Sequence, residues 1–276
     1  MLTRRLIRRY LKLVVSALVV VFFMIVGLYP APFQRLPETE MHVRARLKGP
    51  SPEYWFGTDM FGRDIYSRVV VGTRITYTVS VGAVLIAVMG GVALGIAGGL
   101  SRKIGFGVMR LVDILICFPP IIIAIFALSL MKPGVVPLIL VIGFLYAPRM
   151  ARVVQSAVLE VVQLPYIEAQ RAVGTGLWRI VRRGILPQIM APIIVQATIM
   201  LATAMLLEAG LSFLGLGIRP PTPTWGALIS EARRVMHINL SLLVFPSLVL
   251  SANVIFINLL GDGLRDFLDP KMRRAQ

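Results

Sequence analysis

The sequence predicts an all-α polytopic membrane protein with six transmembrane helices, and three observations lead to this prediction. Hydrophobic residues make up 57% of the chain and charged residues only 15%, whereas soluble domains have about 25% charged residues. The apolar residues gather in long runs, separated by basic or proline-rich stretches. Lys and Arg punctuate these runs without forming a basic domain, so the net charge of +16 does not indicate nucleic-acid binding.

The first apolar run, 13–29, follows a basic N-terminus, 1–12, that we expect in the cytoplasm. A signal peptide has the same pattern, but no small-x-small cleavage site follows, so we expect an uncleaved helix. Residues 30–74 form a polar segment expected outside the cytoplasm, too long for a simple turn. Its acids Asp59 and Asp64 lack the spacing of a calcium loop and are expected to form turns and caps.

The core permease domain is expected over 75–276, and its first half contains three spans. In the second span, 75–100, Gly91, Gly95 and Gly99 recur at steps of four. This spacing allows another helix to approach closely, although membrane helices also simply tolerate glycine. After a basic turn, the third span, 108–130, contains Pro119-Pro120 and is expected to kink there. Two interpretations of its acid Asp113 are open. The side chain has a functional role within the membrane, or it lies near the helix end and only reaches the membrane interface.

The fourth span, 135–151, is expected to continue as a helix in water to about Gln163. The fifth span, 188–213, contains Glu208, which either lines a translocation path or bonds between helices. Residues 214–239 should be extracytoplasmic, with Trp225 as an interfacial anchor and 230–234 as a short surface helix. The sixth span is 240–260, and 261–276 is a basic cytoplasmic tail. Lys and Arg are more frequent on the side of the two termini, which predicts both termini inside.

One polar stretch, 163–187, separates the fourth and fifth spans. Its pattern predicts two short amphipathic helices joined at 174–176. Pro165 suits a first helical position, and Pro187 should close the unit. Glu168 and Arg171 are spaced to pair at i,i+3. From the residues alone, a pair of helices lying on anionic lipid is an equally good interpretation.

This stretch resembles the "EAA" loop of permease subunits of ABC importers, through Glu168-Ala169, Gly174 and Ile185-Leu186-Pro187. Gln170 and Gly184 depart from the residues common in that family, Ala and His. The resemblance implies a type I ABC importer permease fold and a coupling helix that docks into a groove on a cytoplasmic ATPase. The residues it implies for ATPase coupling are Tyr166, Glu168, Ala169, Ala172, Gly174, Leu177, Ile180 and Val181.

A second resemblance narrows the family to the dipeptide, oligopeptide and nickel importers. It rests on Phe56-Gly57-Thr58-Asp59, Gly62-Arg63-Asp64, Ser67-Arg68 and Gly72-Thr73-Arg74, and on the stretches 208–217 and 220–226. It implies a prokaryotic cytoplasmic membrane, a second homologous permease, two ATPase subunits and an extracytoplasmic solute-binding protein. Short peptides are the cargo implied first, and nickel or another small solute is the alternative.

The sequence lacks the motifs of catalysis and nucleotide binding. No phosphate loop, no His-Glu-x-x-His pair and no Gly-x-Ser-x-Gly elbow occurs. We therefore expect no catalytic, cofactor-binding or metal residues, with ATP and Mg²⁺ held by the partner ATPases. A stand-alone ion-coupled carrier that uses Asp113 and Glu208 is a less favoured alternative because no inverted repeat is evident, and a membrane-bound enzyme is less favoured still.

Overall fold

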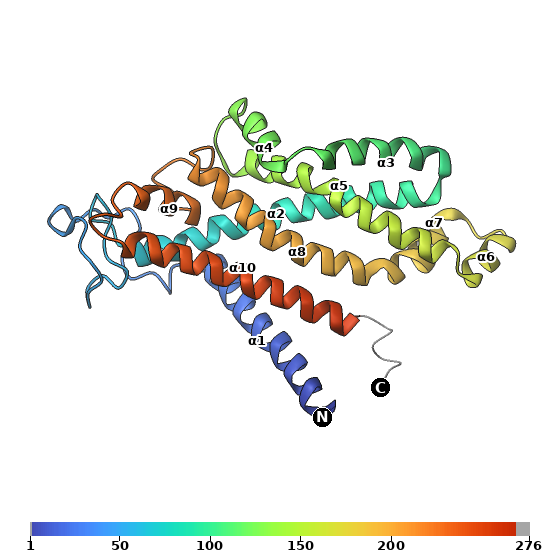
Figure 1. The fold of residues 1–276 in the computed structure, drawn as a ribbon, viewed down its shortest axis with the longest axis horizontal. Helices are drawn as coiled ribbons and strands as arrows, with labels where there is room; N and C mark the ends of the chain where they lie inside the picture. The colour runs from blue at the N-terminus through green and yellow to red at the C-terminus, as the bar shows by residue number, and fades with distance from the viewer. Residues whose placement is uncertain (1, 269–276) are drawn as a thin grey trace.

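The computed structural model describes residues 2–268, so residues 269–276 of the predicted tail lie outside the described residues. The described chain folds into helices joined by short connections, with a longer irregular segment after the first helix (Figure 1). In chain order they are α1 (Leu2–Leu28), η1 (Val43–Ala45), α2 (Ile65–Leu100), α3 (Arg102–Cys117), α4 (Pro120–Ser129), α5 (Val135–Val162), α6 (Pro165–Ala172), α7 (Leu177–Arg179), η2 (Ile180–Ile185), α8 (Leu186–Phe213), α9 (Trp225–Arg233) and α10 (Ser241–Leu268).

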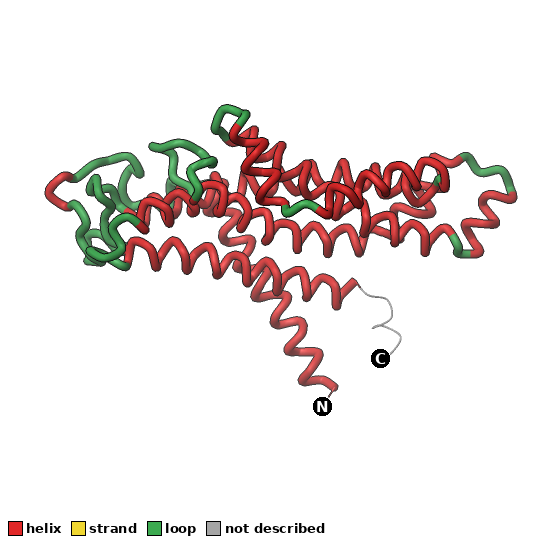
Figure 2. Tube along the Cα trace, turned by 45° about the horizontal axis from the view of Figure 1, so that its top comes forward, coloured by secondary structure: helices red, strands yellow, loops and turns green. Residues whose placement is uncertain are grey.

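Helices α2, α5, α8 and α10 run nearly along one axis, and the fold class predicted from the sequence is confirmed. Among the described residues, five stretches are long and apolar enough to cross a membrane, and the bent pair α3–α4 provides a sixth. Helices α2, α5 and α8 lie side by side, α10 packs on α8, and α1 diverges from the bundle beside α10 (Figures 1 and 2). The irregular segment and the loop that carries α6 lie at opposite ends of this axis.

The close approach of α2 and α5 depends on the glycines spaced by four. A Cβ atom on Gly91 would lie 2.5 Å from Met150 Cβ, and one on Gly95 would lie 2.6 Å from Val154 Cβ. At Gly99 the distance to Val158 Cγ1 would be 2.5 Å. Real Cβ atoms do not come so close, so only glycine permits this packing. The interpretation of the spacing as a helix-packing surface is therefore confirmed.

The third span differs from the expected kinked helix. Two separate helices, α3 and α4, meet at an angle of 88° around Phe118-Pro119. Pro119 is extended, with φ −60° and ψ 122°, and Pro120 occupies the first turn of α4. A residue that precedes proline disfavours the α conformation, so two successive prolines end one helix and start another. The expected basic turn at 101–107 is also shorter, because α3 begins at Arg102.

The second span begins earlier than predicted. Helix α2 starts at Ile65, ten residues before the expected boundary at 75, because Asp64 caps it. The Asp64 carboxylate accepts hydrogen bonds from the Ser67 backbone N–H at 2.9 Å and from the Ser67 hydroxyl at 2.6 Å. This is the capping role expected of Asp64. The long helix α5 reaches Val162, as predicted for the extension of the fourth span.

Residues 30–64, which we name the cap, cover the end of the bundle formed by α2, α9 and α10. Trp225 is wrongly predicted as an interfacial anchor. It is fully buried, and its indole N–H donates to the Val69 carbonyl at 3.1 Å. The surface helix expected at 230–234 is the end of the longer helix α9, which packs on α8 and α10. Because the indole N–H has its hydrogen-bond partner inside the protein, Trp225 does not require a position at the membrane–water interface.

Candidate coupling loop and a buried ion cluster

The loop between α5 and α8 has the helix-bend-helix form predicted for 163–187. Helix α6 begins with Pro165 and ends at Ala172, and the chain reverses through Gly174, whose φ is +75°. The Thr175 N–H closes the turn by donating to the Gln170 carbonyl at 3.0 Å. This left-handed backbone conformation is readily available only to glycine.

The second half of the loop differs from the prediction, because Pro187 does not close it. Helix α7, the π-turn η2 and helix α8 form one continuous stretch of 37 residues from Leu177 to Phe213. Pro187 lies in the first turn of α8, directly after η2, and the helical stretch continues through it. The loop is therefore attached directly to a long apolar helix, with helical backbone throughout the junction.

The inner side of α6 fastens the loop to the bundle. Ile167 is fully buried, and a Cβ atom on Gly184 would lie 2.8 Å from its Cδ1 atom. The Tyr166 hydroxyl donates to the Gly184 carbonyl at 3.0 Å. Gly184, which departs from the histidine common in the resembled family, here makes room for Ile167. Apolar packing and one hydrogen bond thus fix α6 against η2.

The outer side of the loop exposes large apolar side chains. The exposed fraction is 79% for Val173, 59% for Leu177 and 74% for Trp178. The residues implied for ATPase coupling include Leu177 but not Trp178, although a tryptophan in a short polar loop is a recognisable signal. Apolar groups gathered on a rigid loop are typical of a protein-binding surface, and tryptophan is a preferred anchor of such surfaces.

The residues predicted for ATPase coupling divide into two groups. Tyr166 is 38% exposed, and the exposed members also include Glu168, Ala169, Ala172, Gly174 and Leu177. Ile180 is only 2% exposed and packs in the core, and Val181 is half-buried against it. The resemblance implies a coupling role for Ile180 as for Leu177, but Ile180 holds the loop from inside and is not available to a partner.

The predicted pair of Glu168 and Arg171 does not form among the described residues, where no ion pair joins the two side chains. Both side chains are exposed, as are Arg179, Arg182 and Arg183 on the following turns. Surface ion pairs of this kind contribute little, about 0–1 kcal/mol. Glu168 is therefore free to pair with a cation outside this chain.

The two acids predicted at membrane depth have different surroundings. Asp113 of α3 forms an ion pair with Arg152 of α5, and about two fifths of each side chain is exposed. Glu208 of α8 is fully buried. Its carboxylate accepts hydrogen bonds from the Ser212 hydroxyl at 2.7 Å and from the Thr76 hydroxyl at 3.3 Å. This geometry favours the alternative in which Glu208 bonds between helices.

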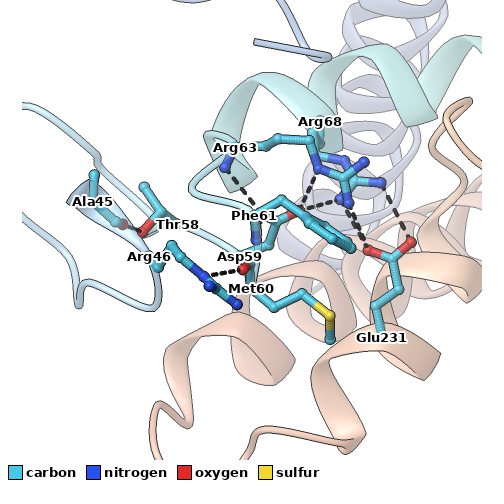
Figure 3. Close-up of polar contacts among 9 residues, drawn as sticks. All are labelled: Ala45, Arg46, Thr58, Asp59, Met60, Phe61, Arg63, Arg68 and Glu231. Carbon is cyan, nitrogen blue, oxygen red and sulfur yellow. Dashed lines mark hydrogen bonds and ion pairs between the residues drawn. The ribbon is translucent and has the colours of Figure 1, made fainter. Parts of the chain in front are cut away.

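A cluster of buried charges, which the sequence analysis missed, fastens the cap to α2 and α9 (Figure 3). The Asp59 carboxylate is 2.5 Å from an Arg68 Nη1 atom and 2.6 Å from Arg63 Nε. Glu231 of α9 is 2.9 Å from Arg68 Nη1 and 3.3 Å from Arg63 Nη2. The two arginines and two acids balance in charge, which is required for burial.

The same cluster fixes the turn of the cap. The second Asp59 oxygen accepts from the backbone N–H groups of Phe61, at 2.8 Å, and Arg63, at 3.0 Å. The turn role expected of Asp59 is therefore confirmed. Glu231 lies 163 residues after Arg68 in the sequence, and no local pattern indicates that these residues meet. Among residues 2–268, no three His, Cys, Asp or Glu side chains gather as metal ligands would.

These observations define a helical multi-pass membrane protein whose loop presents an anchored inner face and an apolar outer face. Residues 87–274 match the family described as binding-protein-dependent transport system inner membrane component. The chain therefore belongs to this family, the permease subunits of ABC importers. Related sequences span almost the whole chain. A glutathione transport system permease protein, GsiD, of Escherichia coli is 40% identical over 96% of this chain and 88% of its own.

A dipeptide transport system permease protein, DppC, of Alkalihalophilus pseudofirmus is 38% identical over 94% of this chain and 86% of its own. The fold is similar to a solved structure of the MetNI methionine ABC transporter in an inward-facing conformation, with a TM-score of 0.62 and 22% identity. That likeness covers 73% of this chain and 96% of the other. Both comparisons agree with the architecture described above and with a multi-pass inner membrane permease.

Proposed function

We propose that this chain is one permease subunit of a peptide importer and that its loop 163–187 transmits the motion of an ATPase to the membrane helices. The observation that carries this proposal is the two-sided loop. Ile167 and Ile180 hold it to the bundle, while Leu177 and Trp178 face outward. ATP-driven closure of the ATPases would push the outer face, and the continuous α7–η2–α8 helix would carry the displacement to the other end.

The proposed complex contains a second homologous permease, two ATPase subunits and a soluble solute-binding protein. ATP and Mg²⁺ would bind to the ATPases, and this chain would contribute no catalytic group. The exposed Leu177 and Trp178 side chains on the outer face of the loop support a protein partner, because tryptophan is a preferred anchor of protein-binding surfaces.

We place the loop and both termini in the cytoplasm and the cap outside it. Exposed Arg179, Arg182 and Arg183 on the loop support this orientation, since short cytoplasmic loops are enriched in Lys and Arg. The cap lies at the opposite end of the helices (Figure 1). The cargo we propose is a short peptide, because the related permeases serve glutathione and dipeptide transport systems. Nickel or another small solute is the alternative cargo.

The test is to purify the tagged chain with its partners, reconstitute the complex in liposomes and measure peptide uptake and ATP hydrolysis together. Glu168→Arg should abolish the peptide-stimulated part of ATP hydrolysis and uptake. The control is Glu160→Arg, which reverses the charge of another exposed glutamate, on α5, and should leave both activities unchanged. Uptake driven by an ion gradient without any ATPase would contradict the proposal and support the carrier alternative. Stimulation by a nickel chelate instead of a peptide would change the cargo alone.

A further inference from the structure

The end of the bundle that carries the 163–187 loop also contains a cavity that the proposed function does not use (Figure 1). This cavity has a volume of about 620 Å³ and lies between the end of α2, the first turns of α3 and the last third of α5. Glycine backbone and apolar side chains form most of its wall, and three polar side chains reach it, Arg110, Asp113 and Gln155. Small-molecule sites have volumes of about 300–1,000 Å³, so the cavity is large enough for a ligand.

Glycines form the floor of the cavity and hold both of its walls against α2. A Cβ atom on Gly105 of α3 would lie 2.3 Å from the Gly98 carbonyl oxygen of α2. On the other side, a Cβ atom on Gly99 would lie 2.5 Å from Val158 Cγ1 of α5. Helices α3 and α5 therefore both rest on α2 through glycine, and the floor between them has no side chain to occupy the space.

An ion pair joins the two walls of the cavity. Asp113, the lining residue of α3 farthest from the start of that helix, pairs with Arg152 of α5. Arg152 also donates to the Gln155 amide oxygen at 3.4 Å, which leaves the amide N–H₂ of Gln155 able to donate to a ligand. Asp113 and Arg152 neutralise each other, so this pair does not repel an anion that enters the cavity.

Arg110 gives the cavity a surplus positive charge. Its side chain is exposed, its guanidinium carbon lies 5.5 Å from the centre of the Phe106 ring, and among the described residues it forms no ion pair. Lys103 stands two turns earlier on the same face of α3, and it is also exposed and without an ion pair in that part of the chain. The ligand that balances Arg110 must therefore be an anion.

The outward face of α3 changes from cationic to apolar along the helix. Beyond Arg110 it exposes Leu111, Ile114 and then Phe118, with exposed fractions of 60%, 50% and 53%. At about 1.5 Å per residue, the 36 residues of α2 span about 54 Å, more than the hydrocarbon core of about 30 Å. The end of α2 at the cavity therefore reaches the headgroup layer, and the apolar face of α3 lies deeper.

We propose that this cavity binds one anionic phospholipid. The phosphate pairs with Arg110 and accepts from the Gln155 amide, and the acyl chains lie along Leu111 and Ile114 on the outward face of α3. A free phosphate ion offers the same charge but has no chains to cover this apolar face. The inference goes beyond the proposed function, because it requires neither an ATPase nor a particular cargo.

The test titrates dioctanoyl phosphatidylglycerol into the full chain, purified in a neutral detergent with the partners that accompany it, and counts bound lipid by native mass spectrometry. One lipid should bind per chain, and dioctanoyl phosphatidylcholine should bind more weakly. Arg110→Gln should weaken phosphatidylglycerol binding by about tenfold or more, as expected for loss of a hydrogen bond to a charged group. Arg110→Lys keeps the charge and should recover most of the affinity. The control Lys132→Gln removes an exposed charge on the turn before α5 and should change nothing.

Equal affinity of the wild type and Arg110→Gln for phosphatidylglycerol would overturn the inference, and so would equal losses in Arg110→Gln and Lys132→Gln. Displacement of the lipid by millimolar inorganic phosphate would assign the cavity to a free anion, and displacement by dialanine would assign it to a peptide carboxylate. Either result would also overturn the inference. The melting temperature of Arg110→Gln in detergent without added lipid should equal that of the wild type, because Arg110 is exposed.

Discussion

The turn at Gly174 allows a sharp test of the loop, because the chain offers a matched control two residues away. Neither Gly174 nor Gly176 has a heavy atom within 4 Å of the position where a Cβ would stand. The two differ in backbone conformation, since φ is +75° at Gly174 and −60° at Gly176. An alanine at either position meets no neighbour, so any difference between the variants arises from the backbone alone.

The left-handed conformation costs an L-residue about 1–2 kcal/mol. Gly174→Ala should therefore shift the loop away from its native form by a factor of roughly 5–30. If the native form docks on the ATPase, the affinity of the ATPase for the permease falls by up to the same factor, because it scales with the populated fraction of the native form. Gly176→Ala carries no such cost and should bind normally. Gly174→Asn should recover part of the affinity, because asparagine tolerates the left-handed conformation better than alanine.

The assay is the apparent dissociation constant of the ATPase subunits from nanodisc-embedded permease, followed by binding-protein-stimulated ATP hydrolysis. Thermal stability of the membrane domain should be the same in all three variants, because Gly174 lies in an exposed turn. Equal losses for Gly174→Ala and Gly176→Ala, or no loss for either, would refute the reasoning that the left-handed turn presents the loop to its partner.

Three further predictions follow from the packing and the exposed residues. Trp178→Ala, at a side chain 74% exposed, should weaken ATPase binding by more than about tenfold without changing the melting temperature, and unchanged binding would remove Trp178 from the interface. Glu231→Gln should destabilise the cap by about 1–3 kcal/mol in thermal unfolding, less than a fully buried pair because Glu231 is 25% exposed. Equal melting of Glu231→Gln and the exposed control Glu160→Gln would contradict this. Gly95→Leu should abolish folding by forcing α2 from α5, as judged by monodisperse yield, whereas Gly210→Ala should be tolerated.

Local features of the fold are predictable from the sequence where the physical cause is itself local. The spacing of Gly91, Gly95 and Gly99 indicates close helix packing because one helix face repeats about every four residues. Asp64 precedes the helix it caps, and Gly174 lies at the turn it permits. The helix-bend-helix loop could be predicted for the same reason, since its signals are a proline, two glycines and a change of periodicity within about twenty residues.

Structural features that depend on residues far apart in the sequence could not be predicted from local sequence patterns. The charges of Asp59 and Arg68 are visible in the sequence, but their partner Glu231 is brought to them only by the packing of α9 on the bundle. Tryptophan is a residue type common at membrane interfaces, which is why Trp225 was predicted to lie there. Only the fold brings it next to the Val69 carbonyl, which accepts the indole N–H inside the protein. The size of the bend at Pro119 also depends on where α4 finds a surface to cover, which a local proline signal does not specify.

The central claim is that the outer face of the 163–187 loop contacts the ATPase, and one cross-linking measurement tests it most directly. Cys117 is the only cysteine of the chain, so Cys117→Ser provides a cysteine-free background. Ala172→Cys, exposed on α6, should then cross-link to an ATPase subunit through a short bifunctional reagent, with a yield that changes when ATP binds. No cross-link at Ala172→Cys in an intact complex that still transports peptide would contradict the account.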